Sequence, residues 1–239
     1  FCKVEFIGNP FMDPFLTKTK ILPNHNKRLG ILPGSRMPEV GQNLRLILSV
    51  VEYMSNLKNV FTDISFDVAL VPSLDDYSLK KIVTSDGWRF CYPMNKDHPL
   101  KLIKNHVTVN IYRNSFVKIV QSCNVLICMA GTATEQASLL GKPIVQIVGN
   151  GPQFIASFAE AQRRLLGSNI FCANGSVKEE KNMVKTCNLI LDLLEISLKE
   201  SLLNEMNQKE IIERDKVLGV SEIMAKSISN SFLTFKYDS

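Results

Sequence analysis

The feature that most constrains the fold is an alternation of short apolar segments with segments of helical periodicity between residues 28 and 173. Most of the apolar segments suit strands that are buried on both faces. Such strands, alternating with helices, are typical of a parallel sheet covered on both sides. We therefore expect an α/β fold with a Rossmann-like, doubly wound parallel sheet. The expected strands are 28–34, 64–72, 106–112, 124–131, 142–149 and 168–173, and the expected helices are 43–57, 74–87, 115–123, 134–141 and 152–167.

The two ends of the chain differ in character from this alternating region. From residue 176 onward the sequence becomes charged and helical, which predicts extra carboxyl-terminal helices. The chain opens on Phe1 in a stretch that resembles the middle of a strand. We therefore expect a fragment whose amino-terminal domain is missing.

Composition and residue spacing give no support to a nucleic-acid-binding, zinc-binding or membrane-spanning protein. The net charge of +5 is too small to indicate a nucleic-acid partner by itself. The six cysteines have neither CxxC pairs nor zinc-site spacing, so we expect reduced, buried thiols of a cytoplasmic protein. No stretch reaches the roughly 18 apolar residues of a membrane-spanning helix.

The first candidate binding turn follows the strand 28–34. Gly34 permits an unusual backbone angle, and Ser35 and Arg36 come next. Ligands bind at the carboxyl edge of doubly wound sheets, and arginine is a bidentate phosphate donor. The alternative is an ordinary surface turn with a solvated arginine.

The second candidate turn follows the strand 124–131. Thr132 and Glu135 have the spacing of a capping box, with Thr132 as the predicted cap of the next helix. Unpaired N–H groups and the positive end of the helix dipole make such a terminus a natural phosphate seat. The alternative is that both residues only cap the helix.

A third turn, Gly149–Gly151, precedes Gln153, whose amide could bind hydroxyl groups; an ordinary turn is equally compatible with the pattern. The chain contains neither a Walker A motif nor a G-x-G-x-x-G sequence. Its three histidines lie far apart and show no metal-site spacing.

Four motifs in this order resemble the lipid-A-disaccharide synthase family, in particular its branch of synthase-related proteins. They are GNPFMD (8–13), LPGSRMPEV (32–40), GTATEQASLLGKP (131–143) and GPQFIASFAEAQRRLLG (151–167). The resemblance implies a GT-B glycosyltransferase, in which the carboxyl-terminal Rossmann-like domain holds a UDP-sugar. Residues 1–15 would end the amino-terminal domain and form the crossing segment, and 16–175 would bind UDP-sugar. Residues 176–239 would pack on the sheet domain or cross back.

The same resemblance assigns a set of UDP-sugar-binding residues. The turn Gly34–Arg36 would lie at the nucleotide, and Gly131–Thr134 would seat the diphosphate. Where the synthase has GTATLE, this chain has GTATEQ, so Gln136 takes the place of a ribose-binding carboxylate and we assign Glu135 to capping. The full set is Gly34, Ser35, Arg36, Gly131, Thr132, Ala133, Thr134, Glu135, Gln136, Gly151, Gln153 and Gln162, with the last two facing the sugar.

The function implied by the resemblance is an inverting UDP-glycosyltransferase that needs neither metal nor cofactor. It would transfer an amino sugar, acylated in the synthase itself, to an unidentified acceptor, for which a lipid monosaccharide is one candidate. The catalytic base would lie in the missing amino-terminal domain, so this chain alone would be inactive. We expect a cytoplasmic protein with no nucleic-acid partner, and a peripheral place at the inner membrane face is compatible with a lipid acceptor.

Two alternatives remain from the sequence. The chain could be a non-catalytic nucleotide-sugar-binding or scaffold module that partners a separate catalytic subunit. A sugar-nucleotide epimerase would share the fold, although the motifs match the synthase group better.

Overall fold

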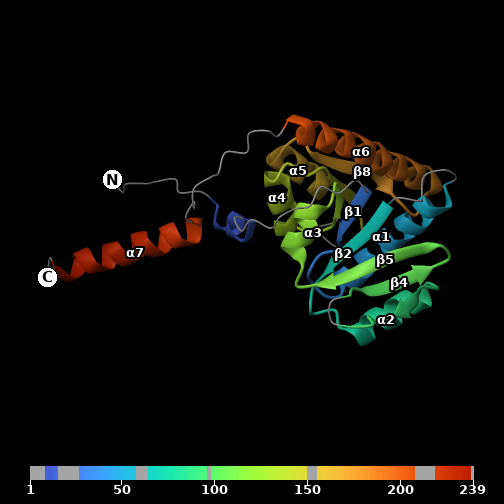
Figure 1. The fold of residues 1–239 in the computed structure, drawn as a ribbon, viewed down its shortest axis with the longest axis horizontal. Helices are drawn as coiled ribbons and strands as arrows, with labels where there is room; N and C mark the ends of the chain where they lie inside the picture. The colour runs from blue at the N-terminus through green and yellow to red at the C-terminus, as the bar shows by residue number, and fades with distance from the viewer. Residues whose placement is uncertain are drawn as a thin grey trace. The chain divides into compact units, whose positions relative to one another are not determined.

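The computed structural model describes residues 9–15, 27–57, 64–95, 98–149, 155–207 and 219–237 of the 239-residue chain. The chain divides into two compact units, Ile21–Met206 and a smaller one made of Phe1–Lys20 with Asn207–Ser239. In the larger unit, strands alternate with helices (Figure 1). The strands are β1 (Lys27–Leu32), β2 (Ile64–Leu70), β3 (Arg89–Cys91), β4 (Leu100–Lys104), β5 (Val107–Arg113), β6 (Val125–Cys128), β7 (Ile144–Val148) and β8 (Ile170–Ser176). The helices are α1 (Glu39–Asn56), α2 (Asp76–Ser85), α3 (Phe116–Ser122), α4 (Thr132–Leu139), α5 (Ala156–Leu166) and α6 (Glu180–Asn207).

The strands form one sheet in the order β3-β4-β5-β2-β1-β6-β7-β8. The six strands from β5 to β8 in this order are parallel, which confirms the doubly wound α/β fold. At one edge the sheet is extended by β3 and β4, which pair in antiparallel fashion with their neighbours and were not among the expected strands. Both strands are short, and β4 reverses into β5 at Asn105, whose φ of 53° is one that asparagine tolerates.

The crossover rule places helices on both faces of the sheet. The connection from β1 to β2 runs in one direction along the sheet, whereas those from β5 to β6, β6 to β7 and β7 to β8 run in the other. Since crossovers between parallel strands are right-handed, α1 lies on one face and α3, α4 and α5 lie on the opposite face. Figure 1 shows this arrangement on the two sides of the strands.

The core of the larger unit lies between the sheet and the face that carries α1. Side chains of α1, α2 and α6 join those of the strands in one continuous apolar cluster. Helix α6 contributes Cys187, Ile190 and Leu194, all fully buried. The first carboxyl-terminal helix therefore packs on the sheet domain. Cys123, Cys128 and Cys187 are buried free thiols, as expected from the sequence, whereas the free thiols of Cys91 and Cys172 are only half-buried.

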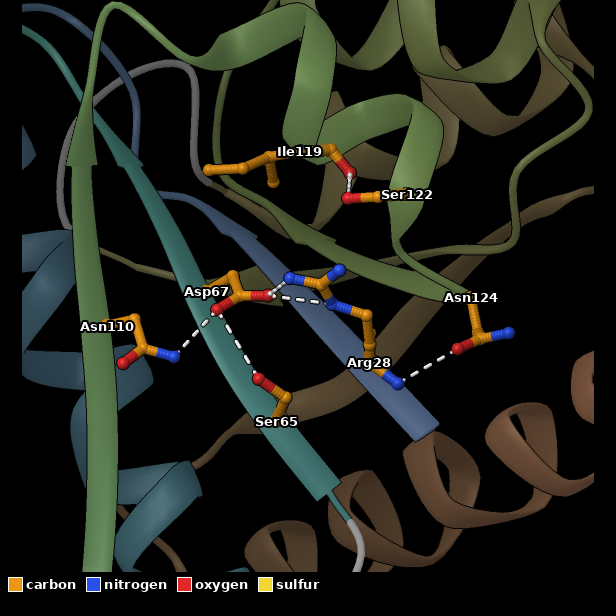
Figure 2. Close-up of polar contacts among 7 residues, drawn as sticks. All are labelled: Arg28, Ser65, Asp67, Asn110, Ile119, Ser122 and Asn124. Carbon is orange, nitrogen blue, oxygen red and sulfur yellow. Dashed lines mark hydrogen bonds and ion pairs between the residues drawn. The ribbon is translucent and has the colours of Figure 1, made fainter. Parts of the chain in front are cut away.

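A polar cluster, formed by Arg28, Ser65, Asp67 and Asn110, ties the three central strands β1, β2 and β5 together. Figure 2 shows these side chains directed toward one another on one face of the sheet. Asp67 is fully buried, and its Oδ2 accepts from Nε and Nη2 of Arg28 at 3.0 and 2.6 Å. Its Oδ1 accepts from Nδ2 of Asn110 at 2.9 Å and lies 3.4 Å from the hydroxyl of Ser65. The buried carboxylate thus has partners on each strand of the group.

The smaller unit contains a 3-10 helix, η1 (Pro10–Phe15), and the final helix α7 (Val220–Tyr237). Within this unit the Asp13 carboxylate accepts hydrogen bonds from the backbone N–H groups of Val220 and Ser221, both at 2.8 Å. Hydrogen bonds from Ser221 and Val220 lower the pKa of Asp13. Asp13 therefore caps α7 from a distant part of the sequence. Of the helices in the described ranges, none has both the length and the apolar character to span a bilayer.

Candidate functional site

A cavity of about 510 Å³ lies at the carboxyl ends of β1 and β6. These neighbouring strands lead into crossovers that run in opposite directions, so the sheet order reverses between them. Such a switch point leaves a crevice outside the sheet, where doubly wound folds bind ligands. The first turn, Gly34–Arg36, and the second turn, Gly131–Ala133, both line this cavity. The structure therefore brings together the two turns that the sequence singled out.

The first turn is fixed by contacts with both α1 and the exit of β6. Gly34 has φ of 104°, and a Cβ added there would lie 2.8 Å from the carbonyl oxygen of Met129. Only glycine fits this close approach at a positive φ without strain. The buried Asn43 of α1 donates from Nδ2 to the carbonyl of Pro33 at 2.9 Å. Backbone and side-chain contacts together hold the turn at the mouth of the cavity.

The charged side chain on the first turn is Arg36, which is exposed and lines the cavity. The ion pairs found in the described part of the chain leave Arg36 without a carboxylate partner. Its guanidinium group is therefore available to an anionic ligand.

The second turn begins α4, but not in the way that the capping-box pattern predicts. The N-cap is Gly131 rather than Thr132, and Gly131 has no side chain that could cap the helix. The Gly131 carbonyl accepts instead from the N–H groups of Thr134 and Glu135, at 3.1 and 3.3 Å. The N–H groups of Thr132 and Ala133 come too early in the helix to find a carbonyl within it. They lie at the positive end of the α4 dipole, beside the cavity.

Thr134 is placed differently from Thr132 and Ala133. Its side chain is fully buried, with Oγ1 donating to the carbonyl of Ala130 at 2.5 Å and lying 3.0 Å from Sγ of Cys128. Burial raises the pKa of the Cys128 thiol to about 12, so this neighbour is neutral. The Thr134 hydroxyl therefore stabilises the turn from inside, and the sequence pattern of alternating Thr and Ala could not reveal which hydroxyl turns inward.

Gly131 itself faces open space. A Cβ added at this residue would meet no described protein atom within 4 Å, and its φ of −77° is not in the left-handed region that favours glycine. Sterics therefore do not require glycine at this position. What glycine provides is free space in the cavity next to the start of α4.

Glu135 and Gln136, the two candidates for contacting the ribose, differ in whether they line the cavity. Gln136 lines the cavity, and Glu135, half-buried on the neighbouring position, is not among the described residues that do. Successive residues on a helix differ by about 100° in direction, which explains the difference.

The third candidate group is only partly described. Gly151 and Gln153 lie outside the described residues. Gln162 on α5 accepts a hydrogen bond from Nε2 of Gln146 at 2.5 Å, and its own Nε2 lies 3.5 Å from the Gly131 carbonyl. Gln162 thus lies against the second turn, on the sheet side, rather than on the lining of the cavity.

Sequence reasoning missed several residues that line the cavity. Those that follow β2 and β5, Val71, Pro72, Asn114 and Ser115, end or follow expected strands, so the rule that selected the first two turns could have found them. Glu39 and Asn43 in the first two turns of α1 also line the cavity. Their helical spacing gave no signal, because it does not show which face of a helix meets a cavity.

Comparison with known proteins gives likenesses in both structure and sequence. No family model matches the chain. Two solved structures of the spinosyn rhamnosyltransferase SpnG superpose on it with low TM-scores. The first is 14% identical, with a TM-score of 0.44, over 75% of this chain and 41% of SpnG. The second, complexed with thymidine diphosphate, is 11% identical, with a TM-score of 0.43, over 79% of this chain and 50% of SpnG.

Among curated proteins, the chain is 27% identical to lipid-A-disaccharide synthase of Persephonella marina, over 78% of this chain and 46% of that protein. It is 24% identical to the enzyme of the same name from Geobacter sulfurreducens, over 62% of this chain and 35% of that protein. The chain thus spans less than half the length of these relatives. The resemblance that the motifs indicated is confirmed over most of the chain.

Proposed function

We propose that this chain, which resembles the lipid-A-disaccharide synthases, is the nucleotide-sugar-binding half of a UDP-glycosyltransferase with the GT-B fold. The observation that carries the proposal is that Arg36 and the amino-terminal end of α4 line one cavity at the switch point of the sheet. The names of the sequence relatives supply the reaction class.

In the proposed complex, the diphosphate of the UDP-sugar lies against the N–H groups of Thr132 and Ala133, with Arg36 and Ser35 alongside. Backbone N–H groups at a helix start bind phosphate oxygens, and the helix dipole favours their negative charge. This charge increases on the leaving diphosphate as the glycosidic bond breaks, so the same groups would stabilise the transition state more than the ground state. No metal ion or cofactor is part of the proposal.

The finer features of the activity are proposals for a whole protein longer than this chain. They are inversion at the anomeric centre, an amino sugar as the transferred group, and an acceptor that can be a lipid monosaccharide. The group that deprotonates the acceptor would come from a domain that faces the cavity.

The first test is a calorimetric titration of the 239-residue chain with UDP, with ADP as the competing nucleotide. Binding of UDP should be tighter than that of ADP, and Arg36→Ala should weaken UDP binding about tenfold, the effect of one charge-assisted hydrogen bond. The matched control is Arg89→Ala, which removes an exposed arginine from the edge strand β3 and should leave UDP binding unchanged. If the folded chain binds no UDP, or if both variants behave alike, the proposed site is wrong.

We further propose that Gln136 rather than Glu135 contacts the ribose, because Gln136 lines the cavity. Gln136→Ala should weaken binding of UDP about fivefold, a typical net value for one neutral hydrogen bond, and should affect 2′-deoxy-UDP less. Glu135→Ala should bind UDP as the unchanged chain does. A variant pair with the opposite ranking, in chains that melt at the same temperature, would reverse the assignment.

A further inference from the structure

Two buried oxygen atoms of α1 have no hydrogen-bond partner among the described residues. They are Oε2 of Glu39 and Oδ1 of Asn43. Both residues line the cavity. Because they are four positions apart on one helix, they lie on the same face, one turn apart.

Contacts within the described part of the protein account for the amide nitrogen of Asn43, but they supply no donor to Oδ1 of Asn43 or Oε2 of Glu39. Asn43 uses its Nδ2 to hold the carbonyl of Pro33, and it is only 1% exposed, so its Oδ1 is removed from bulk water without a protein donor. Glu39 is the first residue of α1, where a carboxylate favours the helix dipole, but a dipole contact alone would be equally served by an exposed side chain. A buried acceptor without a donor is unfavourable, and native proteins rarely retain one without a reason.

The chemistry of the two atoms determines what they can bind. A carboxylate and an amide oxygen only accept hydrogen bonds, so their partner must be an O–H or N–H donor. A phosphate oxygen is itself an acceptor, and its charge would be repelled by Glu39. The wall formed by α1 is therefore unsuited to phosphate, in contrast to Arg36 and the start of α4 on the same cavity.

We propose that Glu39 and Asn43 form a subsite for sugar hydroxyl groups of the bound nucleotide sugar. The proposal rests on the proposed function, since it assumes that the diphosphate lies at the second turn. With the diphosphate there, one cavity presents donors to phosphate oxygens and acceptors to hydroxyl groups. Glu39 and Asn43 would then select ligands that carry hydroxyl groups beside the diphosphate.

The test compares three ligands by calorimetry on the full 239-residue chain: UDP-glucose, UDP and 2′-deoxy-UDP. The informative variant is Glu39→Leu, which removes both carboxylate oxygens and keeps a side chain of similar size. Asn43 is left unchanged, because its replacement would also break the hydrogen bond to Pro33. The matched control is Glu180→Leu, at the exposed first residue of α6.

We expect Glu39→Leu to weaken UDP-glucose binding about tenfold, and Glu180→Leu to leave it unchanged. If the transferred sugar supplies the hydroxyl, binding of UDP stays the same. If the ribose supplies it, UDP weakens as well and 2′-deoxy-UDP weakens less. Equal binding of all three ligands by Glu39→Leu and the unchanged chain would overturn the subsite. Tighter UDP binding by the variant would do so too, because it would mean that Glu39 faces phosphate.

The two proposals can fail separately. If the unchanged chain does not bind UDP, the proposed function fails and the subsite fails with it. If the unchanged chain binds UDP, Arg36→Ala weakens it and Glu39→Leu changes nothing, only the subsite fails.

Discussion

Replacing Gly131 with valine should weaken UDP binding about a hundredfold and leave the free energy of unfolding almost unchanged. The Cβ position of Gly131 meets no described protein atom within 4 Å, and its φ of −77° lies outside the left-handed region that favours glycine. The added methyl groups would instead occupy the space beside the N–H groups of Thr132 and Ala133. Overpacking costs up to about 3 kcal/mol, which corresponds to roughly two powers of ten in affinity.

The measurement combines calorimetric titration with UDP and urea unfolding of the same samples. Gly131→Ala serves as the graded control, and its loss of affinity should lie between those of the unchanged chain and the valine variant. A stable Gly131→Val chain that binds UDP normally would show that the diphosphate does not lie at this turn. A chain that unfolds more easily would show that glycine is needed for the backbone.

The second large effect is expected at the polar cluster of Arg28, Ser65, Asp67 and Asn110. Asp67→Ala should lower the free energy of unfolding by about 3–5 kcal/mol, the cost of removing one partner of a buried ion pair. The carboxylate is fully buried, and its loss leaves the part-buried guanidinium of Arg28 and the amide of Asn110 without their acceptor (Figure 2). Urea unfolding followed by circular dichroism measures the change.

Lys27, which precedes Arg28 on β1, forms an ion pair that offers a control for this experiment. Lys27 pairs with Glu195, whose side chain is 52% exposed. Glu195→Ala should therefore cost no more than about 1 kcal/mol, as exposed ion pairs do. Equal effects of the two substitutions would mean that burial does not make the Asp67 pair special.

Much of the fold follows from local sequence patterns. The strands and helices expected between residues 28 and 173 are present, with ends shifted by a few residues. Buried strands of a parallel sheet are apolar on both faces, so they stand out from the helices that alternate with them. The antiparallel strands β3 and β4 were missed because Arg89–Cys91 and Leu100–Lys104 are short and carry exposed charged residues. Their pairing depends on an edge of the sheet that local patterns do not describe.

The sequence by itself determined where the chain turns after each strand, and therefore that Gly34–Arg36 and Gly131–Ala133 lie at the same edge of a parallel sheet. Direction along a strand is a local property, and it places all carboxyl ends together. The direction of individual side chains was decided only by tertiary packing. The Thr134 side chain is buried, and Asp67 on β2 forms an ion pair with Arg28 on the neighbouring strand β1. Glu39 and Asn43 line the cavity from α1. The Asp67–Arg28 pair and the cavity depend on which strands are neighbours in the sheet, and no local pattern encodes that order.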